Sequence, residues 1–194
     1  MRIHLHNEDH WARSDSTIVS GNAFLDGKHR SSIQLAERIS ETDNADDLKR
    51  LLSRANGFFS VIHKNESNLH VAVDHVRSWP VFYGVTDDVY VSDSAEWIHN
   101  VGGRGGYDPV AGTELLFACF VSGGGTLSRD LRQVRAGELV TIDVDRSTPS
   151  VREERYFTYT PVESSSGINK DELDEVLVET IERLIEYVAV ERYC

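Results

Sequence analysis

The sequence is short of cysteine and of long apolar runs, and both shortages narrow the class of protein. Its two cysteines, Cys119 and Cys194, provide no framework of disulfides such as small secreted domains use. No apolar run is long enough to span a membrane, and the opening residues 1–4 do not begin a signal peptide. We therefore expect a soluble, cytoplasmic protein without a membrane partner.

Basic residues are also scarce. The chain has 20 Lys and Arg against 32 Asp and Glu, which gives a net charge of −12. Nucleic acid is an unexpected partner, since binding to phosphates requires a basic face. Lysines are rarest among the basic residues and occur only as Lys28, Lys49, Lys64 and Lys170. This acidic, lysine-poor composition favours a halophilic cytosol, and an ordinary acidic mesophilic protein is the alternative.

Recognisable catalytic and metal-binding motifs are missing. The glycine-rich segments 102–106 and 123–126 lack the lysine and the flanking strand and helix of a phosphate-binding loop. The histidines of the central region stand near no nucleophile motif such as G-x-S-x-G. A metal site at His4, His6 and His10 would be compatible with strand geometry, but no second cluster with ligand spacing follows. We predict a solvated N-terminal segment and no metal.

Short apolar runs separated by turns indicate an α+β domain. Residues 17–26, 58–62, 69–73 and 89–91 are rich in β-branched and aromatic side chains and predict antiparallel strands. Residues 31–40, 45–54 and 171–189 place apolar side chains on one side and predict helices. Asp108 and Pro109 open a further helix, whose residues 114–120 we expect to be buried, including Cys119.

Two blocks of the sequence carry a family resemblance. The first block consists of Gly57, Phe59, Ala72, Asp74, the run 80–83 and the run 91–96. The second block consists of Thr126, Leu127, Leu131, Gly137 and the run 155–157. In order and spacing they resemble the N-terminal glutaminase domain of asparagine synthetase, a class II glutamine amidotransferase with the N-terminal-nucleophile (Ntn) hydrolase fold. The resemblance covers residues 17–190.

The resemblance implies a fold and a division of the chain. It implies an αββα sandwich of two antiparallel sheets between helices for residues 1–160, followed by a linker at 161–170. Residues 171–194 would be the first helix of an ATP-binding synthetase domain that is truncated here, without its pyrophosphate loop. ATP and magnesium are expected only in that missing domain, so this chain would hold no cofactor. The helix Asp171–Val188 would dock on a synthetase-like domain or subunit, or form a homodimer.

The resemblance also locates a glutamine pocket at Ser20, Gly21 and Asn22, which match the family's N-G-E-I-Y-N strand end. Ser20 replaces the asparagine, and Asn22 replaces the acid that would pair with the substrate ammonium. The S-D-T-E motif that also binds glutamine has no counterpart. The pocket is thus predicted to be degenerate, with glutamine or another amino acid as its ligand.

The loop before Pro80 is the second region to which we assign a role. The family keeps an aspartate and a basic residue there, and Asp74 and Arg77 occupy the corresponding loop. We expect these two side chains to form an ion pair that fixes the crossover before Pro80. Contact with a synthetase domain is the second role considered for them.

The catalytic nucleophile of the family has no counterpart in this sequence. Class II enzymes use a cysteine that becomes N-terminal when Met1 is removed, and position 2 is Arg2. We therefore assign no catalytic residue and expect a degenerate, non-catalytic domain that scaffolds or docks to an ATP-dependent amidoligase. The alternatives are a fragment or split subunit of a functional asparagine synthetase, an amino-acid-binding regulatory domain, and an active glutaminase whose start lies upstream.

Overall fold

The computed structural model describes residues 1–146, 148–160 and 169–191, with side chains up to residue 185. The chain divides into two compact units, Met1–Thr158 and Tyr159–Cys194. Most of the predicted linker 161–170 lies outside the described residues, as does Cys194.

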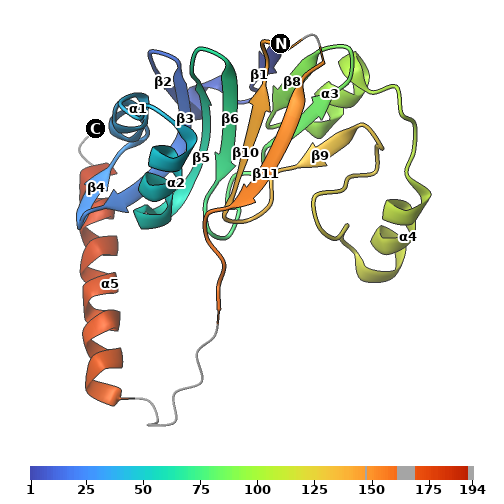
Figure 1. Ribbon diagram of the computed structural model, residues 1–194. Coiled ribbons are helices and arrows are strands. Elements are labelled where there is room, and N and C mark those ends of the chain that lie inside the picture. The colour runs from blue at the N-terminus through green and yellow to red at the C-terminus, as the bar shows by residue number, and fades with distance from the viewer. Residues whose placement is uncertain (147, 161–168, 192–194) are drawn as a thin grey trace. The chain divides into compact units, whose positions relative to one another are not determined.

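Among the described residues, seven strands form the larger sheet of the first unit (Figure 1). The strand order is β11-β10-β6-β5-β3-β2, and β4 pairs with β3 on the edge opposite to β5; every pair is antiparallel. The strands are β2 (Trp11–Ser14), β3 (Thr17–Leu25), β4 (Lys28–Arg30), β5 (Asn56–Lys64), β6 (Asn68–Val73), β10 (Glu138–Asp143) and β11 (Ser150–Arg155).

A second sheet of four strands packs on the first, in the order β1-β8-β7-β9. Its strands are β1 (Arg2–His4), β7 (Phe82–Val85), β8 (Val89–Ser92) and β9 (Leu131–Gln133). Its β7 pairs are antiparallel, whereas β1 runs parallel to β8. A cluster of buried side chains from both sheets, including Val71, Val81 and Val91, fills the space between them.

Helices cover the outer faces of both sheets. Helices α1 (Ser32–Ser40) and α2 (Ala45–Arg54) bury Leu35, Ile39 and the three leucines of α2 against the larger sheet, and α3 (Ala95–Gly102) packs on the smaller one through Ile98. A short 3₁₀ helix (η1, Glu8–His10) precedes β2. The order helix, sheet, sheet, helix confirms the predicted αββα sandwich, with β1–β8 as its one parallel pair among the described strands.

The predicted helices near residues 31–40 and 45–54 are confirmed by their ends as well as by their burial. Ser31 and Gln34 form a capping box at α1, and the Asn44 side chain accepts hydrogen bonds from two backbone N–H groups at α2. These caps satisfy amides that have no partner within the helix.

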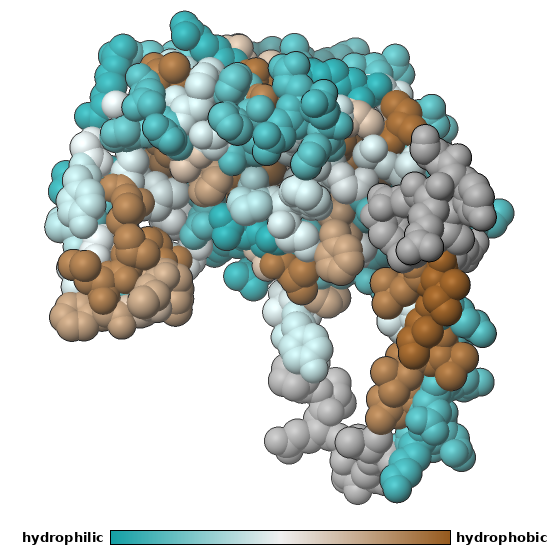
Figure 2. All heavy atoms as spheres, turned by 180° about the vertical axis from the view of Figure 1, so that it is seen from behind, coloured by the Kyte–Doolittle hydropathy of each residue, from teal (hydrophilic) through white to brown (hydrophobic). Residues whose placement is uncertain are grey.

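Helix α4 (Pro109–Ala118) forms as predicted, but the expected burial of residues 114–120 is wrong. Leu116 is 82% exposed and Phe117 is 88% exposed, and Figure 2 shows a brown patch over the region of α4 at the lower left. Cys119, which ends the helix in a left-handed conformation, is exposed as well. The reason is that apolar residues lie all around this helix, whereas only Ala111 and Gly112 are buried.

Helix α5 (Lys170–Glu191) belongs to the second unit, and it confirms the helix predicted at 171–189. Its apolar side chains are exposed, namely Leu173, Val176, Leu177, Val178, Ile181, Leu184 and Ile185. The side chain of Val188 lies outside the described residues. No helix in the described part of the chain is both long enough and apolar enough to cross a membrane.

Candidate functional site

The loop that connects β6 to β7 is held by the buried carboxylate of Asp74, which is 1% exposed. This carboxylate accepts hydrogen bonds from the backbone N–H groups of Phe59 at 3.1 Å, Val76 at 2.8 Å and Ser78 at 2.9 Å. Three amide donors stabilise a carboxylate without a counter-ion. The predicted ion pair between Asp74 and Arg77 is therefore wrong, because among the described residues Asp74 pairs with no cation.

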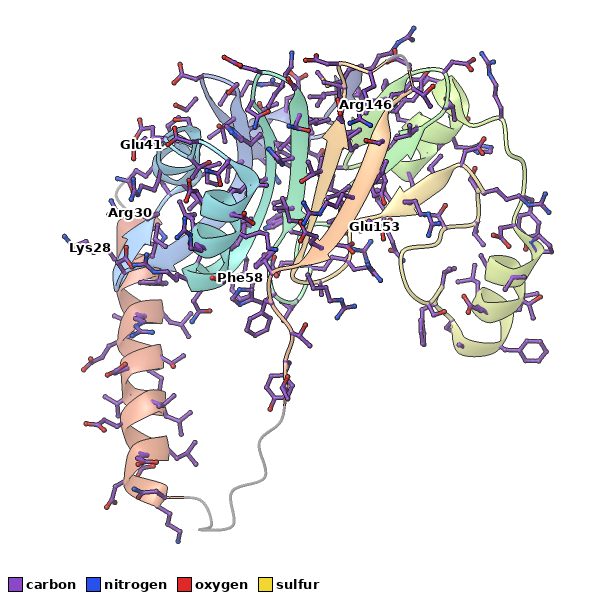
Figure 3. The ribbon with its side chains drawn as sticks, viewed as in Figure 1. Lys28, Arg30, Glu41, Phe58, Arg146 and Glu153 are labelled. Atoms are coloured by element: carbon purple, nitrogen blue, oxygen red, sulfur yellow. The ribbon has the colours of Figure 1, made fainter. Side chains whose placement is uncertain are left out.

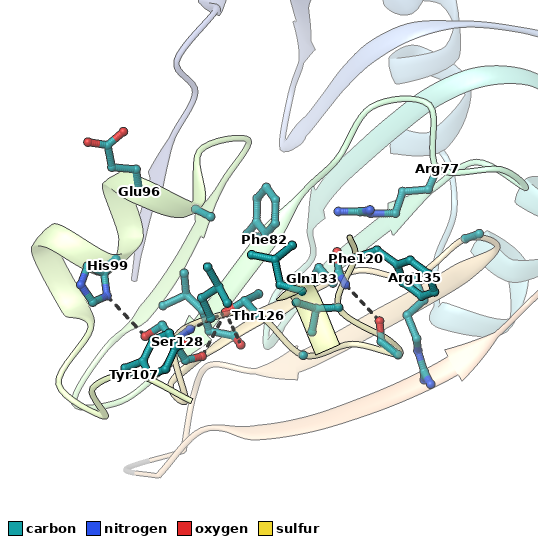
Figure 4. Close-up of a pocket in the computed structure, with 18 of the residues that line it drawn as sticks. Arg77, Phe82, Glu96, His99, Tyr107, Phe120, Thr126, Ser128, Gln133 and Arg135 are labelled. Atoms are coloured by element: carbon teal, nitrogen blue, oxygen red, sulfur yellow. Dashed lines mark hydrogen bonds between the residues drawn. The ribbon is translucent and has the colours of Figure 1, made fainter. Parts of the chain in front are cut away.

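Arg77 turns away from Asp74 because its backbone is left-handed, with a φ of 63°. Its side chain extends over a large cavity, and its Cζ lies 5.8 Å from the centroid of the Phe82 ring (Figure 4). The Nε atom is buried and has no hydrogen-bond partner, and burial lowers the pKa of the guanidinium. Within the described residues no carboxylate pairs with Arg77, so its positive charge has no counter-ion there.

The cavity beside Arg77, called the larger cavity below, has a volume of about 1020 Å³. It lies among the 74–80 loop, α3, β9 and the segment between α3 and β9 that contains α4. Its apolar lining includes Phe82, Leu115, Phe120, Leu127 and Leu131. A mostly apolar cavity with a few polar groups is typical of a ligand or partner site.

Two further arginines line the larger cavity. Arg135 donates from Nε to Glu138 at 2.8 Å and from a terminal nitrogen to Glu153 at 3.3 Å, and these partners raise its pKa. Glu153, labelled on β11 in Figure 3, also accepts the hydroxyl of Tyr83. The charge of Arg135 is thus neutralised, whereas Arg155 has no ion pair within the described part of the chain.

The nearest approach to a nucleophile and a base in the larger cavity is Ser128 with His99. Their Oγ and Nδ1 atoms are 3.4 Å apart, and Ser128 is 7% exposed. A base that activates a hydroxyl group usually lies within about 3.2 Å of it. The contact is longer than this and the serine is buried, so the lining of the cavity favours binding over covalent catalysis.

A smaller cavity of about 280 Å³ brings together parts of both regions that the sequence singled out. Ser20, from the predicted glutamine pocket, lines it together with Trp79 and with Pro80 of the predicted structural loop. Asp93 and Trp11 complete one wall. Asp93 accepts hydrogen bonds from the backbone N–H of His6 at 2.7 Å and from Trp11 Nε1 at 3.4 Å.

Gly21 and Asn22 do not line this smaller cavity. Gly21 has a φ of 86°, and a Cβ atom there would lie 1.9 Å from the carbonyl oxygen of Phe58 on β5. Only glycine can occupy this position, because both the backbone conformation and the close approach of β5 exclude a side chain. Asn22 lies opposite Phe58 in the same strand pair.

Sequence reasoning missed Asp93, Trp11 and Trp79 as cavity residues. Asp93 lies inside the run 91–96 that carried the family resemblance, but its contacts come from the segment at residues 6–11. Nothing in the local sequence links these two segments, since the pairing of β1 with β8 is what brings them together.

The N-terminal segment is held by packing of its apolar and aromatic side chains. Leu5 and Trp11 are buried, which corrects the expectation of a solvated terminus. The His4 ring stacks on Trp97 with centroids 4.7 Å apart, and the His10 ring meets Trp79 edge-on at 5.9 Å. Among the described residues, no group of three or more His, Cys, Asp or Glu side chains is placed to hold a metal ion.

Comparison with known proteins gave structural neighbours only. No protein-family model matches the chain, and no curated protein matches it. It is similar to the glutamine phosphoribosylpyrophosphate (PRPP) amidotransferase from B. subtilis complexed with ADP and GMP, at 19% identity and a TM-score of 0.46. It is also similar to a structure of the allosteric regulatory enzyme of purine biosynthesis, at 18% identity and a TM-score of 0.46.

Each similarity covers 77% of this chain and 31% of the other, so the chain spans less than a third of the length of these neighbours. A likeness at this level of identity concerns the glutamine amidotransferase-like fold alone. The αββα layers described above rest on the chain's own sheets, helices and buried clusters.

Proposed function

We propose that the chain is a non-catalytic glutamine amidotransferase-like domain that docks on an ATP-dependent amidoligase of the asparagine synthetase type. The observation that carries the proposal is the exposed apolar surface formed by α4 and by Phe120, two residues beyond its end. Val110, Leu116, Phe117 and Phe120 are between 63% and 88% exposed. Exposed apolar groups of this kind mark sites of protein interaction.

The position of this surface in the sequence supports the choice of partner. Helix α4 precedes, across the segment 119–125, residues 126–137, which resemble the stretch that closes the glutaminase domain in asparagine synthetases. Helix α5 presents a second set of exposed apolar side chains, and it follows the residues where that family passes into its synthetase domain. In this proposal ATP and magnesium bind to the partner, which is a separate subunit or the remainder of a longer chain.

Among the described residues, neither of the two hydroxyl–histidine pairs below forms an accessible, activated nucleophile, which supports a non-catalytic role. Ser128 lies too far from His99, as described above. The Thr17 hydroxyl lies 2.7 Å from His63 Nδ1, but Thr17 is fully buried in the larger sheet and substrate cannot reach it. Cys119 is exposed at the end of α4 and belongs to neither cavity.

The non-catalytic part of the proposal is tested by glutamine hydrolysis. Purified protein is incubated with glutamine at low and high salt, and ammonia release is compared with an enzyme-free blank. We expect no release above the blank. Turnover that scales with protein concentration would contradict this part and leave the docking part to be judged separately.

The docking part is tested by co-expression with an asparagine synthetase-type amidoligase from the same organism, followed by affinity capture and a titration. Phe117→Ser should weaken the complex by about tenfold or more, because exposed aromatic anchors dominate interface energies. The matched control is Phe58→Ser, since Phe58 on β5 is 56% exposed and lies outside α4 (Figure 3). Equal effects of the two substitutions, or no complex with the unmodified chain, would argue against this surface.

A second function, an amino-acid-binding regulatory domain, is favoured by the smaller cavity. The carboxylate of Asp93 and the indole rings of Trp11 and Trp79 surround a space of amino-acid size, and a carboxylate with aromatic faces attracts an ammonium group. Binding would raise the melting temperature, and the rise would continue with the logarithm of ligand concentration above the Kd. Thermal unfolding with glutamine, glutamate and asparagine tests it, and Asp93→Asn should abolish any shift.

A further inference from the structure

We infer that the larger cavity binds an organic anion, whose carboxylate or phosphate group pairs with Arg77 and Arg155 and whose apolar body lies against Phe82 and Phe120. This site differs from the smaller cavity at Ser20, and of the four residues named for the docking surface it shares only Phe120. It does not depend on the proposed function, because a catalytic domain or a free-standing one would have the same cavity.

The first argument is the conformation of Arg77. A left-handed backbone is sparsely populated by residues other than glycine and asparagine, so the fold holds Arg77 in an unfavourable conformation. That conformation directs the guanidinium over the cavity, toward Phe82 (Figure 4). Such outliers gather at binding sites, where the surrounding structure maintains them.

The second argument is the missing counter-ion. Burial of the Nε atom removes this part of the Arg77 guanidinium from water without a compensating hydrogen bond. The acids nearby are already engaged, since Glu138 and Glu153 pair with Arg135. Glu96 extends from α3 away from Arg77 in Figure 4. An external anion is the group that completes this arrangement, and Arg155 supplies a second cation.

The third argument concerns the body of the ligand. Phe82, Leu127 and Leu131 line the cavity together with Phe120, and a space of about 1020 Å³ is far larger than an inorganic ion requires. The apolar walls contribute favourably to binding only when an apolar surface of the ligand covers them. The ligand is therefore an amphipathic anion, with one charged end and an aliphatic or aromatic remainder.

The direct test is isothermal titration of the unmodified chain with 4-phenylbutyrate, with phenyl phosphate and with the uncharged 4-phenylbutyramide. We expect saturable binding of at least one anion, weakened by salt, and much weaker binding of the amide. The tighter of the two anions identifies the charged group as carboxylate or phosphate. Absence of binding by both anions up to about 10 mM, or equal binding of the amide, would overturn the inference.

Three arginine variants locate the site. Arg77→Asn removes the guanidinium but tolerates the left-handed backbone, and it should weaken anion binding by about tenfold. Arg155→Gln should weaken it by about threefold. The control is Arg13→Gln, because Arg13 is exposed on β2 and outside the cavity, and it should leave binding unchanged.

Circular dichroism first establishes that each variant is folded. If Arg77→Asn fails to fold, Arg155→Gln on the exposed edge strand β11 decides by itself. Unchanged anion binding in the folded cavity variants, or an equal loss in Arg13→Gln, would show that the anion binds elsewhere and would overturn the assignment.

Discussion

Helices α2 and α4 have the same length and both contain several apolar residues, yet α2 is packed against the core and α4 is exposed to solvent. In α2 the leucines Leu48 and Leu52 are fully buried against the larger sheet. In α4 the residues Leu116 and Phe117 are more than four-fifths exposed. Apolar content alone therefore does not determine burial in this protein.

The difference lies in how apolar and charged residues alternate along each helix. In α2, charged residues separate the leucines, so that one face is apolar and the other is solvated. In α4 the run at residues 115–118 is apolar on every side, and no single face can bury it against one sheet. A helix of that kind requires a second covering surface, which agrees with the docking role proposed for it.

The largest effect that tests this comparison is expected for Leu48→Ala. Truncation of a fully buried leucine should lower the free energy of unfolding by about 3 kcal/mol, because it leaves a cavity under α2. Leu116→Ala on α4 is the matched control and should change that free energy by less than about 0.5 kcal/mol. Urea unfolding followed by circular dichroism measures both, and similar losses would mean that α4 is packed as well as α2.

The free energy of unfolding should also fall in acid, because two histidines are buried in the larger sheet. His63 and His70 stack within the larger sheet, and burial lowers the pKa of His63 and lowers that of His70 from 6.5 to about 4. The unfolded chain therefore binds more protons than the folded one in this range, so stability is full above pH 6.5 and falls as pH drops toward 4. We expect a loss of about 2 kcal/mol, allowing for coupling between the two imidazoles.

Urea unfolding at several pH values measures this loss. His70→Asn removes one titrating group, and its unfolding free energy should depend less steeply on pH between 6.5 and 4. A pH dependence that stays the same in the variant would assign the acid sensitivity to other groups.

A smaller loss of stability is expected for a substitution at Asp74, which lies in the loop between β6 of the larger sheet and β7 of the smaller one. Asp74→Asn replaces one acceptor oxygen by an N–H₂ group facing backbone donors, and it should cost about 1.5 kcal/mol. Asp43→Asn, at an exposed aspartate in the loop between α1 and α2, should be neutral. If the two variants unfold at the same urea concentration, the three amide contacts do not hold the loop.

The smallest change in stability is expected for Phe117→Ser. Its unfolding free energy should stay within about 0.5 kcal/mol of the unmodified chain, since the side chain is 88% exposed. Its self-association at high concentration should fall, because a large apolar side chain leaves the surface. Light scattering measures the second quantity, and an unchanged scattering signal would show that α4 does not contribute to association.

The sequence was sufficient for those parts of the fold that local patterns determine. The amphipathic spacing of Leu48, Leu51 and Leu52 predicted α2 and its buried face, and the runs at 58–62 and 69–73 predicted two central strands. The resemblance to glutaminase domains supplied the layer order, which local pattern alone permits but does not determine.

The candidate sites depended on features that the sequence does not display. The composition of the loop does not indicate that the backbone of Arg77 is left-handed. The sequence therefore led to the prediction of an ion pair between Arg77 and Asp74. The burial of α4 was predicted from its apolar residues, although burial requires an element to cover them. Both cavities combine segments that are distant in the sequence, such as His6 with Asp93.

The close approach of β3 to β5 has a consequence for tracing the ancestry of this fold. Gly21 leaves no room for a side chain beside Phe58, and a Cβ atom on Gly57 would lie 2.3 Å from the carbonyl oxygen of Asn22. Selection can alter most surface residues of this acidic chain, but each of these two glycines can be replaced only if the strands separate. Distant relatives should therefore be recognisable by this pair of invariant positions after overall identity has faded.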